Sequence, residues 1–307
     1  KKNSDVPNLR FPEFQGEWKE KRLSEIADLF KGNGISKEQL TDTGEPCILY
    51  GELYTKYKSE VISDIFSKTD IDTRKLVKSK ANDVIIPCSG ETAVDIATAR
   101  CVPYDNILLG GDLNIIRLYD CDGSFMSYQL NGKRKYDLAK VAQGVSVVHL
   151  YGDHLKGVKT YNPCLDEQKK IAKLLSLLDE RIATQNKIIE DLKKLKSAIG
   201  KLLFAQKPNG WNRLDTLFSK GKAGGTPTCS NKEYYNGEIP FLSINDITKQ
   251  GKYVRCTEKY MSQSGLENSS AWVVPKYSLI MSMYASVGLV TINEILFLQV
   301  RQCLQCN

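Results

Sequence analysis

Apolar residues recur at steps of three and four through the middle of the chain, with Gln185 at one of these positions. No Gly or Pro occurs from Asp166 to Ile199, so the spacing predicts one continuous amphipathic helix over 164–206. At about 1.5 Å per residue, roughly 39 helical residues reach about 58 Å. Charged residues crowd the other faces, which is typical of a spacer or a helix-pairing surface; the alternative is a core helix of one large domain. The positions predicted to contact a partner helix are Ile171, Leu174, Leu178, Ile182, Ile189, Leu192, Leu195 and Ile199.

The segments on either side of this helix resemble each other. Trp18 and Trp211 are each followed by an Arg-Leu pair, a Leu-Phe pair and a Lys close to a Gly, and the motif that begins at Gly44 recurs at Gly237. Both matches have an offset of 193 residues. A weaker match relates 83–90 to 278–285, two apolar runs that end in small residues. The matches predict a duplicated module, with chance similarity of short strand patterns as the alternative.

Short apolar runs separated by polar loops predict small β-sheets in these modules. In the first module the runs lie at 48–50, 84–87, 107–109, 113–118 and 145–150. The predicted fold class is α+β, with two mixed α/β modules that contain small twisted sheets and are joined by a long coiled-coil-type helix. The predicted boundaries are an N-terminal tail over 1–16, a first module over 17–163, the helix over 164–206 and an incomplete second module over 207–307.

Composition narrows the function classes without selecting one. The net charge of +7 and pI near 8.8 fit a nucleic-acid partner, although many other proteins are mildly basic. No apolar run approaches the roughly 20 residues that span a bilayer, and the start of the chain lacks the apolar segment of a signal peptide. Nine irregularly spaced cysteines look like reduced thiols of a cytoplasmic protein. Cys303 and Cys306 form the one close pair, and His149 and His154 do not complete a convincing metal site, so none is predicted.

Polar loops beside the predicted strands supply candidate DNA contacts. Three cations flank an Asn-Gly turn at 131–136 and can neutralise phosphates. The segment 51–58 interleaves aromatics, hydroxyls and cations, and 143–146 places an amide and a hydroxyl beside a Gly, as base or backbone contacts require. Ordinary surface turns explain these segments equally well. With the loop 89–92 and three positions in the second module, the predicted contacts are Lys31, Asn33, Tyr50, Tyr54, Thr55, Lys56, Tyr57, Ser89, Thr92, Lys133, Arg134, Lys135, Gln143, Ser146, Lys222, Thr226 and Asn245.

Two motifs point instead to an enzyme. The segment 30–34 (FKGNG) matches the Phe-x-Gly-x-Gly loop that holds S-adenosylmethionine in amino-methyltransferases, and 162–164 (NPC) resembles the start of their Asn-Pro-Pro-aromatic motif but fails at its third position. A lone Gly-x-Gly is weak unless it joins a strand to a helix. No Walker loop, His-Glu-x-x-His motif or nucleophile elbow occurs. No catalytic residue is therefore predicted, and a self-contained adenine methyltransferase is kept as the alternative.

Taken together, the chain resembles the specificity subunits of type I restriction-modification enzymes. The resemblance covers nearly all of 9–292 and is quite specific in combining the duplicated module with a Pro-x-x-x-Glu-Gln helix entry. The segments that carry it are 9–14 (LRFPEF), 16–18 (GEW), 50–57 (YGELYTKY), 162–172 (NPCLDEQKKIA), 177–182 (LLDERI), 224–227 (GGTP) and 239–247 (IPFLSINDI).

The resemblance implies a non-catalytic subunit. Such proteins carry two target recognition domains, each reading half of a bipartite DNA sequence, and helices that act as a ruler between them. They bind modification subunits, which methylate adenine with S-adenosylmethionine, and restriction subunits, which translocate and cut DNA with ATP and Mg. We therefore expect double-stranded DNA and both kinds of subunit as partners, no cofactor on this chain and no membrane association.

The chain departs from the family after its second module. A complete member has a second long helix there, antiparallel to the first, whereas this chain ends at Asn307 and 294–307 (EILFLQVRQCLQCN) does not look like part of a recognition domain. A C-terminal truncation or frameshift explains both features. We then expect the exposed stripe to pair with the helix of another chain, as in a homodimer. An inactive scaffold that only occupies modification subunits is a further alternative.

Overall fold

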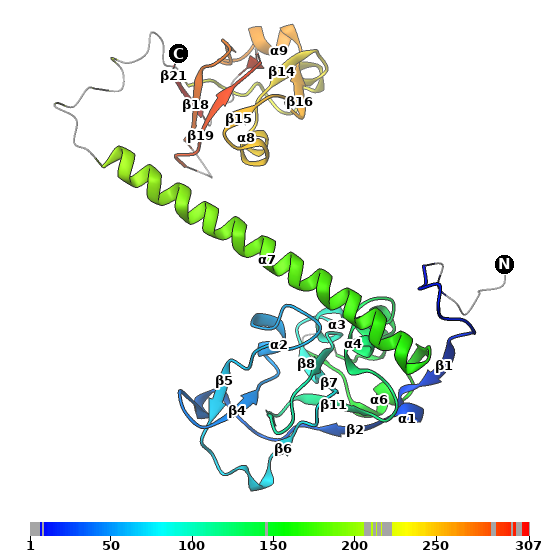
Figure 1. Cartoon of the computed structure of the whole chain (residues 1–307). Helices are drawn as coiled ribbons and strands as arrows, with labels where there is room; N and C mark the ends of the chain where they lie inside the picture. Colours follow the sequence, from blue (N-terminus) through cyan, green and yellow to red (C-terminus); the bar gives the residue numbers. More distant parts are fainter. Residues whose placement is uncertain are drawn as a thin grey trace. The chain divides into compact units, whose positions relative to one another are not determined.

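The computed structural model describes residues 7, 9–144, 147–205, 210, 213, 216, 223–283 and 287–295, and the backbone of 297–298 and 303–306. Ser146, Lys222 and Trp211 lie outside the described residues. The chain divides into two compact units, Lys1–Ala198 and Ile199–Asn307. The predicted α+β class with small sheets and a long helix is confirmed (Figure 1).

The described strands of the first unit form four sheets. A ribbon of β1 (Lys19–Arg22) and β13 (Lys159–Asn162) is antiparallel, as is the pair β8 (Ser89–Gly90) and β12 (Val148–His149). A four-stranded antiparallel sheet has the order β2 (Ala27–Lys31), β11 (Leu113–Leu118), β7 (Asp83–Pro87), β9 (Arg100–Val102). A five-stranded sheet has the order β3 (Leu40–Thr41), β5 (Ser67–Thr69), β4 (Glu45–Ile48), β10 (Leu108–Leu109), β6 (Val77–Lys78). In it, β4 and β10 are parallel.

The helices of this unit are short apart from one. They are α1 (Leu23–Ile26), α2 (Glu52–Thr55), α3 (Ala93–Ile96), α4 (Gly123–Asn131), α5 (Lys135–Val141) and α6 (Gly152–Lys156), with 3-10 turns at Lys37–Gln39 and Thr73–Lys75. Side-chain caps begin several of them: Asp122 accepts a hydrogen bond from the Phe125 amide of α4 at 2.8 Å. Such caps satisfy amides that the helix leaves unpaired.

Strands β7 and β11 form the centre of the core because both of their faces are covered. Val84 and Ile86 lie in one apolar cluster with Met126 and Leu130 of α4, whereas Ile85 and Ile115 lie in another with Leu53 of α2. Successive side chains of a strand point to opposite faces. The sheet is therefore enclosed between the helical layer and the segment that contains α2 and the five-stranded sheet.

The second unit has two four-stranded sheets. One has the order β16-β14-β20-β17, with Lys259–Met261, Ile239–Phe241, Phe297–Leu298 and Val273–Val274. The other has the order β15-β19-β18-β21, with Tyr253–Val254, Val290–Asn293, Leu279–Ser282 and Cys303–Cys306. The helices are α8 (Ile244–Gln250), α9 (Gln263–Glu267) and the 3-10 turn Lys232–Tyr235.

Strand register confirms the predicted repeat. Cys47 pairs with Ser67 in the first unit, and Pro240 pairs with Tyr260 in the second. Each residue of the second pair lies 193 positions after its counterpart in the first, the offset found between Trp18 and Trp211. The order β5-β4-β10-β6 is matched by β16-β14-β20-β17. The same arrangement of strands is therefore built twice.

The end of the chain corrects one expectation. Strand β20 lies between β14 and β17 as β10 lies between β4 and β6, and β21 pairs with β18 as β11 pairs with β7. The expectation that 294–307 does not continue a recognition domain is wrong, because these strands occupy the equivalent places in the second unit. Their hydrogen bonds come from the backbone, which explains why an irregular sequence of side chains concealed them.

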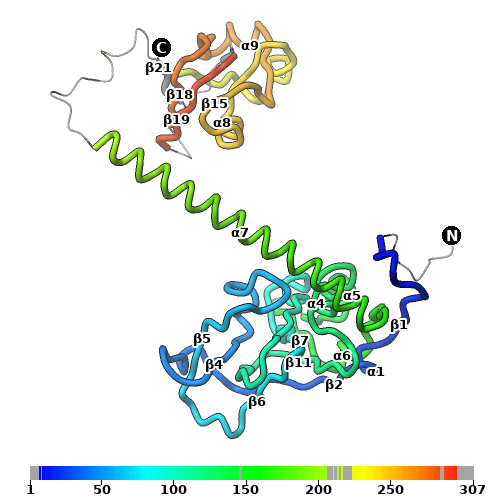
Figure 2. Tube along the Cα trace, in the orientation of Figure 1, coloured from blue at the N-terminus to red at the C-terminus, as the bar shows by residue number. Residues whose placement is uncertain are grey.

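The predicted long helix is α7, which runs unbroken over Leu165–Phe204 (Figure 2). Every residue of α7 from Glu180 to Ile199 is exposed, and among the apolar positions Leu178 is 51% and Ile182 59% exposed. Since a core helix would bury this stripe, that alternative is excluded. No described helix is both long and apolar enough to cross a membrane.

The first turn of α7 is fixed by two buried side chains. Glu167 is fully buried and accepts two hydrogen bonds from Arg10, both at 2.7 Å, and one from Trp18 Nε1 at 3.4 Å. Gln168 donates to the Pro163 carbonyl and accepts from the Asp122 amide, both at 2.9 Å. The Glu-Gln pair of the helix entry thus holds α7 to the N-terminal segment and to the start of α4.

We expect Glu167→Ala to destabilise the base of α7, because it removes the buried carboxylate that accepts hydrogen bonds from both Arg10 and Trp18. Hydrogen exchange of the β1 and β13 amides measures the effect, and these amides should exchange faster. Glu190→Ala, on the exposed part of the same helix, should change exchange by less than about 0.5 kcal/mol. Equal protection in the two variants would contradict the anchoring role of Glu167.

Candidate nucleic-acid interface

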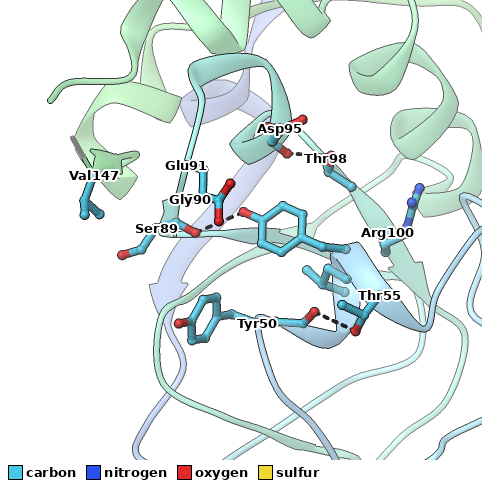
Figure 3. Close-up of a pocket in the computed structure, with 12 residues that line it drawn as sticks. Tyr50, Thr55, Ser89, Gly90, Glu91, Asp95, Thr98, Arg100 and Val147 are labelled. Atoms are coloured by element: carbon cyan, nitrogen blue, oxygen red, sulfur yellow. Dashed lines mark hydrogen bonds between the residues drawn. The ribbon is translucent and has the colours of Figure 1, made fainter. Parts of the chain in front are cut away.

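A pocket of about 730 Å³ opens between α2, the β8–α3 connection and Val147 (Figure 3). Its walls come from segments that are far apart in the sequence. Four of the predicted contacts meet there, and the lining residues are Tyr50, Gly51, Leu53, Tyr54, Thr55, Ser89, Gly90, Glu91, Asp95, Thr98, Arg100 and Val147. The structure therefore brings the 50–58 and 89–92 segments to one surface.

Buried Glu52 determines which side chains of α2 reach that surface. Its carboxylate accepts hydrogen bonds from the Leu49 amide at 3.0 Å, from Lys56 Nζ at 2.6 Å and from the Ser67 hydroxyl. Lys56 is therefore ion-paired within the unit. Tyr57 is only 4% exposed and its ring lies 5.4 Å from that of Phe66, so the prediction of Tyr57 as a DNA contact is wrong. Leu53 of α2 and Tyr57, two residues after its end, both lie in the second apolar cluster.

The hydroxyls around the pocket mostly bond within the protein. Tyr54 donates to the Ser89 carbonyl at 3.0 Å, and burial raises the pKa of Tyr54 above its ordinary range. The Thr55 hydroxyl donates to the Gly51 carbonyl at 3.0 Å, and Thr92 caps α3 by accepting from the Asp95 amide at 3.1 Å. The Ser89 hydroxyl lies 3.2 Å from Nδ1 of His149. These bonds fix the wall, and Tyr50, 39% exposed, presents its ring at the mouth.

Arg100 forms the deepest polar part of the pocket. It is 8% exposed, and one terminal nitrogen donates to the Tyr57 carbonyl at 3.1 Å. Burial lowers the pKa of Arg100 from its usual value, opposed by the charges of Glu60 and Asp179. Its Nε has no hydrogen-bond partner among the described residues. Sequence reasoning missed Arg100, because it lies on a buried strand where an apolar residue is usual.

The three cations of the basic turn at 131–136 differ in whether they have partners within the protein. Arg134 lies 4.6 Å above the Tyr161 ring and pairs with Asp137 at 2.8 Å, with a side chain only 14% exposed. The prediction of Arg134 as a DNA contact is corrected, because its guanidinium already joins α5 to β13. Lys133 and Lys135 make no ion pair with the described residues, and Lys133 is exposed. These two lysines remain candidates.

The glycine-rich segment at 30–34 is the end of β2 followed by an irregular connection. Asn33 donates to the Lys75 carbonyl at 2.9 Å, and Lys31 pairs with Asp112 at 3.6 Å on the surface. A Cβ on Gly32 would lie 2.0 Å from the Gly110 carbonyl oxygen, so glycine is needed for this close approach. This connection leads from β2 to the 3-10 turn at Lys37–Gln39 and not to an α-helix. The methyltransferase alternative is therefore not favoured.

The remaining predicted contacts lie elsewhere on the two units. Gln143 is exposed. Its amide donates to the His149 carbonyl and its carbonyl accepts from the His149 amide, and the next residue, Gly144, has a φ of 125°. In the second unit Thr226 lines a pocket of about 600 Å³ with Tyr235 and Tyr260. Asn245 is exposed and donates to Glu258 at 3.0 Å. No cluster of three metal-binding side chains occurs in the part of the chain that the structure describes.

Residues 15–194 match the family model described as the type I restriction modification DNA specificity domain. The match covers more than half of the chain. It includes the four sheets of the first unit and most of α7. The chain therefore belongs to this family. Membership was the interpretation drawn from the duplicated module and the helix entry, and it is confirmed.

Two curated relatives are similar over part of their length. The specificity subunit of the type I restriction enzyme MjaVIII from Methanocaldococcus jannaschii is 28% identical over 204 residues, which are 66% of this chain and 44% of that protein. The HindI specificity subunit from Haemophilus influenzae is 34% identical over 89 residues, or 28% of this chain and 19% of that protein. The matched regions thus span less than half of these relatives.

Solved structures share the fold. The type I restriction-modification S subunit from M. genitalium aligns with a TM-score of 0.58 at 17% identity, covering 98% of this chain and 75% of that one. A chain from a structure of type I R-M complex assembly and conformational transition aligns with a TM-score of 0.54 at 14% identity, covering 97% and 76%. At these identities the likeness concerns the fold alone.

The two sides of the basic turn should respond differently to substitution. We expect Arg134→Ala to lower the free energy of unfolding by about 1–2 kcal/mol, since it removes the stacking on Tyr161 and the ion pair with Asp137. Lys133→Ala, which removes an exposed side chain, should change it by less than about 0.5 kcal/mol. Hydrogen exchange of α5 and β13 measures both, and equal losses would contradict this division.

Proposed function

We propose that this chain is a non-catalytic DNA-recognition subunit of a type I restriction-modification complex. The observation that carries the proposal is family membership through 15–194, a region that contains the pocket, the basic turn and most of the helix. In this proposal each unit reads one half of a bipartite target. The first unit uses Tyr50, Ser89, the 89–92 loop and Gln143 for the bases, and Lys133 and Lys135 for phosphates.

The chemistry of the complex is assigned to other chains. Modification subunits would supply S-adenosylmethionine and methylate adenine, and restriction subunits would supply ATP and Mg for translocation and cleavage. The described cysteines are free, which agrees with the cytoplasmic location proposed for the complex. This chain would then contribute sequence preference and the surfaces on which those subunits assemble.

The apolar stripe of α7 supports a second part of the proposal. Six large apolar residues of α7 from Leu178 to Ile199 are about half exposed and, with Gln185, follow one another at three- and four-residue steps. A stripe of this kind buries itself against another helix, and roughly 25 cal/mol is gained per Å² of apolar surface removed from water. We propose that it pairs with a helix of a second copy or of a partner subunit.

Binding to duplex DNA tests the main proposal. The affinity of the full chain should fall with salt, and Lys133→Ala/Lys135→Ala should flatten the slope of log K against log salt by about 2 without changing sequence preference. Lys37→Ala, at a surface lysine outside the predicted set, should leave the slope unchanged. Unchanged slopes for the double variant would remove the basic turn from the interface. A wild type without affinity for any duplex would favour the inactive scaffold.

Helix pairing is tested by the size of the protein at micromolar concentration. We expect Leu178→Lys/Ile182→Lys to weaken self-association roughly tenfold or more, because it places charge in the apolar stripe. Glu180→Lys reverses a charge on the opposite face and should leave association unchanged. Sedimentation equilibrium measures both. A strictly monomeric wild type would rule out the homodimer.

A further inference from the structure

Glu91 is the one charged side chain of the pocket lining that makes no hydrogen bond within the described structure. It lies in the loop between β8 and α3, is exposed, and makes no hydrogen bond or ion pair with the described residues. The other carboxylate of the pocket, Asp95, accepts the Thr92 hydroxyl at 2.6 Å. Figure 3 shows Glu91 and Tyr50 facing the pocket from opposite sides.

The surroundings leave the Glu91 carboxylate free to turn outward. The pocket behind it, about 730 Å³, is larger than any side chain that borders it. At its inner wall the Arg100 Nε lacks a protein partner, and buried donors of this kind are normally satisfied by ordered water. No contact within the described structure holds the Glu91 side chain in one position. The carboxylate is therefore available to a ligand at the mouth.

A free carboxylate on a DNA-binding surface repels phosphates and is useful only where it meets a donor. In the major groove the donors are the exocyclic amino groups of cytosine and adenine. Adenine places its N7 acceptor beside the amino group, which repels a carboxylate, whereas cytosine places a C–H there. Tyr50 and Val147, 39% and 52% exposed, supply apolar surface at the mouth for that C–H edge.

We propose that Glu91 selects a cytosine at one position of the half-site read by the first unit, by accepting a hydrogen bond from the cytosine N4 amino group in the major groove. This inference rests on the proposed DNA-recognition function. It assigns one base and one atom to a residue that is otherwise only part of a loop.

Selection from a duplex library with randomised positions tests the assignment on the full chain. Wild type should prefer cytosine at one position. Glu91→Ala should reduce that preference roughly tenfold, and Glu91→Gln should shift it toward adenine, because an amide pairs with both N6 and N7. Asp42→Asn is the matched control, because Asp42 is exposed, its side chain makes no hydrogen bond or ion pair in the described structure, and its loss changes the net charge equally.

The outcomes separate the two proposals. In one outcome, wild type shows a sequence preference that none of Glu91→Ala, Glu91→Gln and Asp42→Asn changes. That result would overturn the role of Glu91 while DNA recognition stands. A preference that shifts to guanine or thymine with Glu91→Gln would overturn the cytosine assignment. Absence of any sequence preference in wild type would overturn both. Circular dichroism checks that the variants keep the wild-type fold, as expected for an exposed residue.

Discussion

The fully buried carboxylate of Glu167 is the contact on which the organisation of the first unit depends. It draws Arg10 and Trp18 of the N-terminal segment onto the first turn of α7, while the adjacent Gln168 bonds to the chain before α4. A buried charge is tolerated only with such full pairing. The helix can therefore leave the unit with most of its length exposed and still begin at a defined place and angle.

Periodic features of the sequence were enough to predict the organisation of the chain. The helical spacing of α7 and the 193-residue repeat are signals that extend over many residues, and strand pairing reproduces the repeat. The two C-terminal strands were not foreseen, because two- and four-residue strands show no clear alternation. Their pairing depends on neighbours distant in the sequence.

Individual contacts were harder to predict than the surface that contains them. The sequence placed Tyr50, Tyr54, Thr55 and Ser89 in candidate segments, and the fold gathers them at one pocket. It could not show that Glu52 and Tyr57 are buried, or that Arg134 already stacks on Tyr161. Exposure and existing partners decide whether a polar residue can bind a ligand, and both follow from tertiary structure.

The ribbon of β1 and β13 has a consequence for how the first unit can vary. Lys19 pairs with Asn162 and Arg22 with Lys159, so the chain enters and leaves this body at adjacent positions. The two ends of the chain segment between these strands are held together by backbone hydrogen bonds, which depend little on side chains. Loops and strands of this region that do not contact α7 can thus be exchanged while the ribbon and the bond between Asp122 and Gln168 stay the same.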